Sequence, residues 1–299
     1  MGRETNKQRR QAQAQSVREK AAAARAVQQR SDQRRRAVVI LSSVVALAVV
    51  GVLIAVIAIN SSGSKDTSKG TAASQSILDQ VTSIPRTVSD PIGAGPVVST
   101  PESVTGGTPL DANGKPTLLF IGAEFCPFCA VERWSVIDAL SKFGTFSGLQ
   151  QIVSSEDKIG TFSFKNATYT SKYLNFDGKE QADQNRKELQ KLTSVELAQW
   201  SKYVGPGQSG PGYPFMDFNG TYVSPGTMLD PTPFKGKTAT EIAAALNDPT
   251  TKISQSINGA ANVITAAVCK ITNNKPASAC TPAVTSLQAR FAPYGSSSG

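Results

Sequence analysis

Two cysteines three positions apart offer the clearest chemistry in this sequence. Cys126 and Cys129 enclose Pro127 and Phe128 in a C-x-x-C motif, which follows an apolar run and precedes a helical pattern. At a helix N-terminus, unpaired backbone N–H groups and the helix dipole stabilise a thiolate. A cysteine one turn further along is placed to attack a mixed disulfide on the first. The motif therefore predicts Cys126 as the nucleophile and Cys129 as the resolving thiol. No cofactor is expected, because the dithiol is itself the redox centre.

Two other uses of this motif stay open. The pair could form a stabilising disulfide, although closing so short a loop removes little entropy from the unfolded chain. It could also provide half of a zinc site together with Cys269 and Cys280. Zinc sites with four thiolates usually use two closely spaced pairs, whereas ten residues separate these two cysteines. We therefore favour a redox-active pair and expect no metal site.

The composition removes many other catalytic chemistries. The chain has 299 residues, four cysteines and no histidine. Ser-His-Asp and Cys-His catalysis are thereby excluded, as are zinc, copper and haem sites with histidine ligands. The net charge is +9, but residues 1–36 alone carry +8 of it. The remainder of the chain is nearly neutral, so no nucleic-acid-binding face is expected there.

Cys269 and Cys280 are expected to form a structural disulfide. Cys269 ends one predicted helix and Cys280 precedes another, so a bridge would hold two C-terminal helices across a short loop. Loop-closure entropy gives such a bridge about 2–3 kcal/mol. A second redox pair that exchanges electrons with Cys126 and Cys129 stays open as the alternative.

The first 70 residues predict a membrane anchor. Residues 1–36 form a basic tail, and residues 37–59 are 23 uncharged, mostly apolar positions. A helix of that length spans about 34 Å, enough for a bilayer core of about 30 Å, and is longer than the apolar part of a signal peptide. The positive-inside rule places the tail in the cytoplasm and all four cysteines outside, where disulfides persist. Residues 60–70 are expected to be a flexible stalk.

Residues 71–299 predict one α/β domain outside the cell membrane. The spacing of apolar residues predicts helices over 74–84, 126–144, 179–204, 240–246 and 252–269. Short apolar or extended runs predict strands over 116–122, 149–154, 161–164 and 167–173. Asn219-Gly220 lies between two strand-like runs within 213–223, which is a strong hairpin signal. Strand, helix and strand, then a hairpin and a helix, are typical of an α/β fold.

The motifs resemble those of the thioredoxin superfamily. Phe120-Ile-Gly-Ala-Glu-Phe-Cys-Pro-Phe-Cys129 is similar to the active-site strand and turn of thioredoxins, and Tyr213-Pro-Phe-Met-Asp-Phe-Asn-Gly220 to their cis-proline loop and hairpin. More closely, residues 122–144, with Glu132-Arg133-Trp134, resemble a prokaryotic family of membrane-anchored thioredoxin-like proteins of uncharacterised function.

This resemblance covers about residues 71–290. It implies a thioredoxin-like fold in which Tyr213 and Pro214 bind the substrate chain, with Pro214 in the cis form. By itself, an X-Pro bond is more often trans, so an ordinary turn proline is the alternative. Between Cys129 and Pro214 lie 84 residues, more than a minimal thioredoxin has, and about 155–205 are therefore expected to be a helical insert.

The sequence also departs from the family pattern. Thioredoxins carry a buried aspartate six residues before the first cysteine, where this chain has Phe120. It lacks the histidine with which strongly oxidising relatives stabilise their thiolate, so a moderate reduction potential is expected. Glu124 or Glu132 could relay protons, but both are expected to be surface carboxylates. Trp134 and Trp200 are expected to be core residues without a function.

These features together predict a membrane-tethered thiol–disulfide oxidoreductase that acts on extracytoplasmic proteins. A redox-recycling membrane protein, by analogy a quinone-linked one, is the expected partner. The alternative is a thioredoxin-fold scaffold that assembles a membrane complex, such as a respiratory one, without turnover. An exposed and acidic Cys126 favours the first function, and a buried, permanently bridged one favours the second. The direction of electron flow and the substrate stay open.

Overall fold

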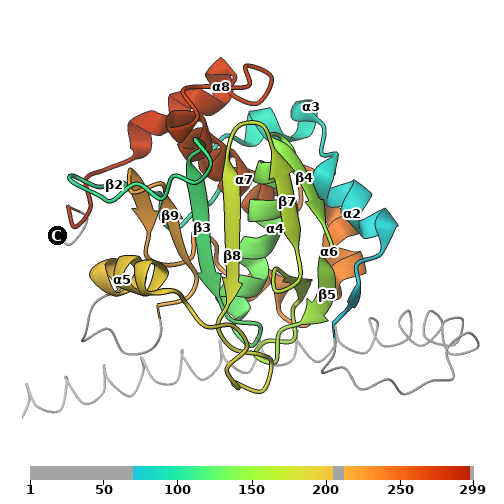
Figure 1. The fold of residues 1–299 in the computed structure, drawn as a ribbon. Helices are drawn as coiled ribbons and strands as arrows, with labels where there is room; N and C mark the ends of the chain where they lie inside the picture. Colours follow the sequence, from blue (N-terminus) through green and yellow to red (C-terminus); the bar gives the residue numbers. More distant parts are fainter. Residues whose placement is uncertain (1–69, 205–211, 297–299) are drawn as a thin grey trace, which may run out of the picture. The chain divides into compact units, whose positions relative to one another are not determined.

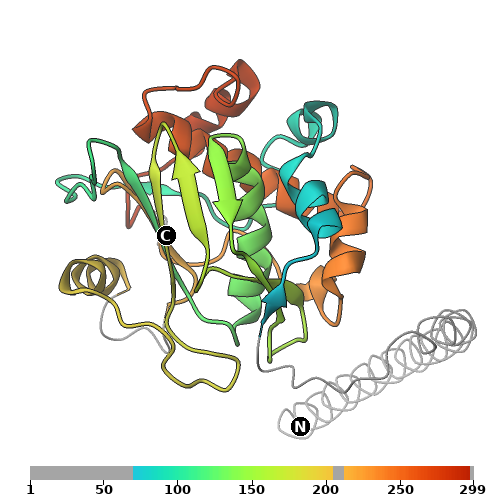
Figure 2. The same ribbon diagram turned by 45° about the vertical axis from the view of Figure 1, so that its right-hand side comes forward.

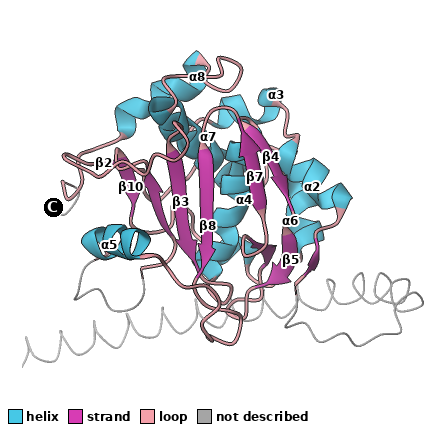
Figure 3. Cartoon of the chain, in the orientation of Figure 1, coloured by secondary structure: helices cyan, strands magenta, loops and turns pink. Residues whose placement is uncertain are grey.

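The computed structural model describes residues 70–204 and 212–296, which form a mixed α/β fold (Figure 1). Its helices are α2 (Gln75–Thr82), α3 (Arg86–Ser89), α4 (Pro127–Ser141), α5 (Ser194–Tyr203), α6 (Ala239–Ala245), α7 (Lys252–Ile271) and α8 (Pro282–Thr285). Its strands are β1 (Thr71–Ala72), β2 (Glu102–Ser103), β3 (Thr117–Gly122), β4 (Gly144–Ser147), β5 (Gln150–Val153), β6 (Gly160–Ser163), β7 (Thr168–Ser171), β8 (Asn175–Glu180), β9 (Phe215–Phe218) and β10 (Tyr222–Ser224). Figure 3 distinguishes the two kinds of element by colour.

The largest sheet has the strand order β2-β10-β9-β3-β8. β3 pairs in parallel with β8 and antiparallel with β9, and all six of its residues are buried. Complete burial is typical of a central strand that is covered on both faces. β9 and β10 form the hairpin predicted around Asn219-Gly220, and both turn residues have positive φ. The remaining strands form two smaller sheets, with the orders β1-β5-β6 and β4-β7.

The side chains of β3 alternate between two separate parts of the core. Leu118 and Phe120 belong to the larger part, which includes residues of α4 and α7. Leu119 and Ile121 belong to a smaller part, where they meet Tyr203 of α5. In Figure 2, α4 (green) runs along the strands. The strand that leads into the C-x-x-C motif is therefore held from both faces of the sheet.

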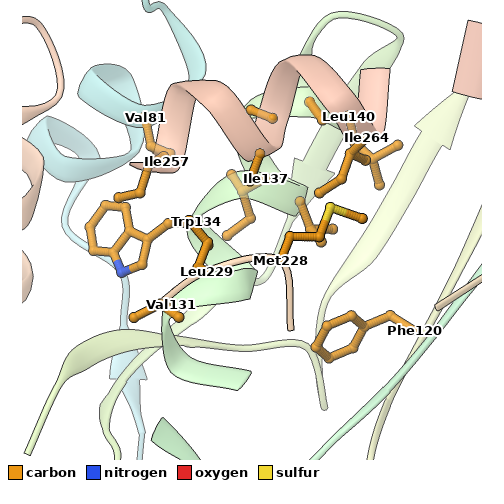
Figure 4. Packing of buried hydrophobic residues seen from close by; sticks show 14 of the residues in the cluster. Val81, Phe120, Val131, Trp134, Ile137, Leu140, Met228, Leu229, Ile257 and Ile264 are labelled. Carbon is orange, nitrogen blue, oxygen red and sulfur yellow. The ribbon is translucent and has the colours of Figure 1, made fainter. Parts of the chain in front are cut away.

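Helix α4 is buried on nearly every side. Of its first 14 residues, only Phe128 is not buried. Figure 4 shows Trp134 and Ile137 of α4 in one cluster with Ile257 and Ile264 of α7. The sequence predicted one apolar face, whereas the structure encloses the polar face as well. The charged side chains of α4 therefore need partners inside the protein, because an unpaired buried charge is unfavourable.

The prediction of a helical insert over about residues 155–205 is wrong. Its first half contains the strands β6, β7 and β8, and α5 is the one helix among its described residues. The helix predicted from residue 179 begins at Ser194, where Thr193 and Glu196 form a capping box. Lys179 instead belongs to β8, which is held by its pairing with β3. Pairing with a distant strand thus overrode the local spacing of leucines.

The other predicted elements of this domain are confirmed. The strands expected over 116–122, 149–154, 161–164 and 167–173 are β3, β5, β6 and β7. The helices expected over 74–84, 126–144, 240–246 and 252–269 are α2, α4, α6 and α7. Their ends differ from the predicted ones by a few residues, as is usual for element boundaries.

The predicted tail and anchor, residues 1–36 and 37–59, lie outside the described residues, as do residues 60–69 of the stalk. Within 70–204 and 212–296, no helix has both the length and the apolar character to cross a membrane. The anchor, the domain boundaries and the location of the domain therefore stay predictions from the sequence.

Candidate redox site

The turn between β3 and α4 positions the C-x-x-C motif. Cys126 is the N-cap residue of α4, and Pro127 is the first helical residue, where an N–H would have no partner within the helix. The backbone N–H of Cys129 donates a hydrogen bond to Sγ of Cys126 at 3.4 Å. Cys126 thus lies at the helix N-terminus, where the helix dipole favours a negative charge.

Both cysteines of the motif are free thiols, and both are largely enclosed. Cys126 is 5% exposed and Cys129 has no exposed surface, while Phe128 between them is 42% exposed. Of the two sulfurs, that of Cys126 is therefore the one an incoming group meets first. Cys126 therefore matches neither expectation in full. It is unbridged, which favours the oxidoreductase, but only slightly exposed, which favours the scaffold.

The two thiols differ in acidity. The hydrogen bond with the Cys129 thiol lowers the pKa of Cys126, and a backbone N–H and the Arg133 guanidinium act in the same direction against burial. Burial raises the pKa of Cys129 well above its ordinary value, and the Cys126 thiol adds to this effect. Cys126 is thus the more acidic thiol, as a nucleophile requires.

A fully buried ion pair lies next to the motif, and the sequence analysis did not find it. Nε and Nη2 of Arg133 donate to the two carboxylate oxygens of Glu180 at 2.8 and 2.6 Å. Nη2 also donates to the Ala123 carbonyl at 2.9 Å, and the same oxygen accepts the backbone N–H of Cys126 at 3.3 Å. Arg133 therefore shares an acceptor with the backbone of Cys126. The available signal was the run of strongly apolar residues on both sides of Glu132 and Arg133 in α4.

Glu124 and Glu132 are both buried, so the expectation of surface carboxylates is wrong. Glu124 accepts a hydrogen bond from the Ser163 hydroxyl at 2.7 Å, and burial raises its pKa. Glu132 accepts from the Thr227 hydroxyl and the Met228 backbone N–H, both at 3.0 Å, and burial raises its pKa to about 7. Glu132 therefore ties α4 to the segment after β10, while Glu124 lies in the turn that leads to Cys126.

The loop before β9 contains a cis peptide bond between Tyr213 and Pro214, as the resemblance implied. The Tyr213 ring stacks on Trp200, with 5.5 Å between ring centroids, and meets the edge of Phe125 at 6.4 Å. Its hydroxyl donates to Gln181 at 2.6 Å. Burial raises the pKa of Tyr213, and the two thiols of the motif add to this shift. Trp200 thus supports the Tyr213 ring and is also packed, partly buried, against the smaller part of the core.

The loop between β8 and α5 borders the motif on another side. The guanidinium of Arg186 lies 4.1 Å from the ring centroid of Phe125, the residue before Cys126. Arg186 also forms an ion pair with Glu156. The residues on either side of Cys126 thus carry a ring covered by Arg186, that of Phe125, and an exposed ring, that of Phe128.

Cys269 and Cys280 form a disulfide, which confirms the predicted pairing. The bridge joins the C-terminal part of α7 to the residues just before α8. It takes up two of the four thiolates that the alternative zinc site would need. Among the described residues, no group of three or more His, Cys, Asp or Glu is arranged to hold a metal ion.

The comparison with known proteins adds a family assignment. A family model described as a domain of unknown function (DUF929) matches residues 104–208 and 210–270. The matched ranges include the C-x-x-C motif, the buried ion pair and the loop around Pro214. No curated protein and no solved structure matches the chain.

Proposed function

The chain belongs to the family of the domain of unknown function DUF929, and we propose that it is a thiol–disulfide oxidoreductase with a thioredoxin-like active site. The observation that carries the proposal is the difference between the two thiols. Cys126 is unbridged, caps a helix and has a lowered pKa, whereas Cys129 is fully buried with a raised pKa. This division of acidity is what a nucleophile and a resolving thiol need.

The reaction is an exchange of disulfide bonds. In the direction of substrate reduction, the Cys126 thiolate attacks one sulfur of a substrate disulfide, whose S–S bond breaks as a mixed disulfide forms. Cys129 transfers its proton to the leaving substrate sulfur and attacks Sγ of Cys126. The Cys126–Cys129 disulfide forms, and the second substrate sulfur leaves and takes up a proton from the solvent. Two electrons pass to the substrate, and oxidation of a substrate dithiol is the same sequence reversed.

The substrate class is a polypeptide thiol or disulfide outside the cell membrane. This part of the proposal depends on the anchor predicted over residues 37–59 and on the oxidising compartment that follows from it. The exposed ring of Phe128 and the half-buried ring of Tyr213 support it, because they offer apolar surface to a chain that approaches Cys126, whereas Pro214 itself is buried. Tyr213 and Pro214 hold the substrate backbone in this proposal, and a membrane redox protein recycles the dithiol.

A second candidate is a scaffold that assembles a membrane complex without turnover. The observation in its favour is the small exposed surface of Cys126, 5%, next to a Cys129 that has none. A dithiol kept only for packing would exchange neither with glutathione nor with a substrate disulfide.

The reduction potential of the Cys126–Cys129 pair separates the two candidates. We would equilibrate the purified full-length chain with a series of glutathione ratios and trap the remaining thiols. A potential between about −120 and −270 mV, the range of known oxidoreductases, is expected. The Cys129→Ser variant is expected to accumulate a mixed disulfide with a disulfide-bonded peptide. Thiols that do not exchange with glutathione, or a potential below about −300 mV as in structural bridges, without any mixed disulfide would overturn the oxidoreductase and leave the scaffold.

A further inference from the structure

Arg133 is a buried cation with one donor group that is not used. Its side chain has no exposed surface, and Nε and Nη2 are bonded to Glu180 and to the Ala123 carbonyl. Among the described residues, Nη1 has no hydrogen-bond partner. Burial of a charge is unfavourable even when it is paired, and replacing a buried ion pair by apolar residues is often neutral or stabilising. An arginine in this position therefore calls for an explanation beyond stability.

The geometry places this cation beside the dithiol. Arg133 follows Cys129 by four positions on α4, so the two side chains share one face of the helix. Long side chains on a helix point back toward its N-terminus, which on α4 is the end that carries Cys126. Both Arg133 and Cys129 lie against the segment just before the motif. Arg133 donates to the Ala123 carbonyl, and Gly122 lies so near Cys129 that a Cβ on it would be 3.3 Å from the cysteine Sγ.

We propose that Arg133 is the positioning residue that stabilises the thiolate of the Cys126–Cys129 pair, and that Glu180 limits the strength of this effect. This inference rests on the proposed function, because it specifies what sets the acidity of the dithiol that carries that function. It assigns to a buried arginine the stabilising charge that a chain without histidine must obtain elsewhere.

The electrostatic surroundings agree with this assignment. The charge of Arg133 lowers the pKa of both cysteines. Among the described residues, the other titratable or charged groups near the site include Glu180 on β8, Glu124 before the motif, Tyr213 before Pro214, Lys165 after β6, and the ion pair of Arg186 with Glu156. Of these, Glu180 is the group bonded to Arg133, so it offsets part of the field at the thiols.

A stabilised thiolate changes the redox balance of the pair. The interaction with Arg133 exists when the dithiol is reduced and ionised, and it disappears when the Cys126–Cys129 disulfide forms. It therefore stabilises the reduced form and makes the disulfide more oxidising. Removal of Arg133 is expected to make the disulfide harder to reduce, and removal of the Glu180 charge is expected to have the opposite effect.

The test uses the full-length chain with Cys129→Ser, in which the alkylation rate of Cys126 by iodoacetamide is followed against pH. The neutral pair Arg133→Gln with Glu180→Gln is expected to raise the apparent pKa of Cys126 by about one unit, a roughly tenfold slower reaction near neutral pH. Glu180→Gln alone is expected to lower that pKa, and Arg133→Lys to stay close to the parent protein. The matched control is Asp138→Asn with Lys142→Gln, which removes another ion pair of α4 and is expected to leave the profile unchanged.

A raised pKa of Cys126 in the neutral-pair variant and a lowered one in Glu180→Gln would support a role of charge. A merely structural role gives no reason for shifts of opposite sign. An unchanged profile in the neutral-pair variant, or an equal shift in the control, would overturn the inference. Near-ultraviolet circular dichroism establishes that each variant is folded. If the neutral pair does not fold, the direction of the Glu180→Gln shift decides, and an unchanged or raised pKa there would overturn the inference.

The alkylation profile does not depend on turnover, so the two proposals fail separately. Shifted profiles in a chain that forms no mixed disulfide would support the role of Arg133 and reject the oxidoreductase. Mixed disulfides together with unshifted profiles would reject the role of Arg133 and leave the oxidoreductase in place.

Discussion

The indole ring of Trp200 lies parallel to the phenol ring of Tyr213, with an interplanar angle of 5° and 5.5 Å between centroids. The indole N–H also donates to the Gly212 carbonyl at 3.3 Å. Helix α5 is thereby connected to the loop that carries Pro214. Helix α5 therefore helps to hold the proposed substrate-binding loop in place.

Trp200→Ala is expected to loosen this loop. The loss of a half-buried aromatic ring and of its stacking partner is expected to lower the free energy of unfolding by about 1–3 kcal/mol. In the proposed reaction, KM for a disulfide-bonded peptide should rise more than kcat falls, because the thiols themselves are untouched. Trp200→Phe, which keeps an aromatic ring, serves as the control. Equal losses in both variants would contradict a role for the stacked pair.

The two cysteines of the motif are expected to respond differently to substitution. Cys126→Ser should abolish disulfide exchange, whereas Cys129→Ser should retain the first step and stop at the mixed disulfide. Non-reducing gel electrophoresis after reaction with a disulfide-bonded peptide measures both outcomes. Trapped mixed disulfide in Cys126→Ser would reverse the assigned roles.

The disulfide between Cys269 and Cys280 is expected to act on stability alone. Replacing both cysteines by alanine should lower the free energy of unfolding by about 2–3 kcal/mol, since the bridge closes a short loop. Disulfide exchange at Cys126 should stay at the parental level. A loss of exchange in a variant that remains folded would instead support the alternative of a second redox pair.

The carboxyl group of Glu132 predicts a specific dependence of stability on pH. Burial raises its pKa from 4.5 to about 7, so the folded protein holds a proton that the unfolded chain has released between these values. The free energy of unfolding should therefore decrease as pH rises from about 4.5 to 7, by at most about 1.4 kcal/mol per unit from this group. Above pH 7 this contribution should be constant.

Glu132→Gln is expected to remove that part of the decrease. Urea unfolding of both proteins at a series of pH values between 4.5 and 8 measures the difference between them. Asp217→Asn is a useful comparison, because burial raises the pKa of that carboxyl group to about 6. The contribution of Asp217 to the free energy of unfolding should stop changing with pH above about pH 6. Parallel stability curves for the parent protein and Glu132→Gln would refute the prediction.

Gly122, the last residue of β3, is expected not to tolerate a side chain. A Cβ there would lie 2.7 Å from the ring of Phe120 and 3.3 Å from Sγ of Cys129. Gly122→Ala should lower the free energy of unfolding by about 1–3 kcal/mol through overpacking. It should also slow the resolving step at Cys129 more than the attack by Cys126, which rapid-quench trapping of the mixed disulfide would measure. Gly226→Ala, where a Cβ meets nothing within 4 Å, is the control.

Elements whose signals are local could be predicted from the sequence. Cys126 before Pro127 predicted the start of α4, and Asn219-Gly220 predicted the hairpin between β9 and β10. Helix 252–269 followed from the spacing of its apolar residues and is α7. The helical insert failed because the leucines around residue 190 mimic helical spacing, while the segment before them pairs with β3.

The electrostatic part of the site could not be predicted in the same way. Glutamate is usually exposed, so the sequence alone favours a surface position for Glu124 and Glu132. Their burial follows from the elements that cover them, namely β6 and the segment after β10. For Arg133, the partner is 47 residues away in sequence. A buried charge requires a partner, but the sequence does not indicate which carboxylate provides it.

The sequence by itself determined the dithiol, the helix it begins, the hairpin after Pro214 and the absence of histidine chemistry. Each of these depends on residue identity or on neighbours within one turn or one strand, where backbone geometry and side-chain size act directly. Tertiary structure alone decided the enclosure of α4, the pairing of Arg133 with Glu180 and the stacking of Trp200 on Tyr213. Those features arise from packing between distant segments, and packing sets the burial, the local field and therefore the acidity of each thiol.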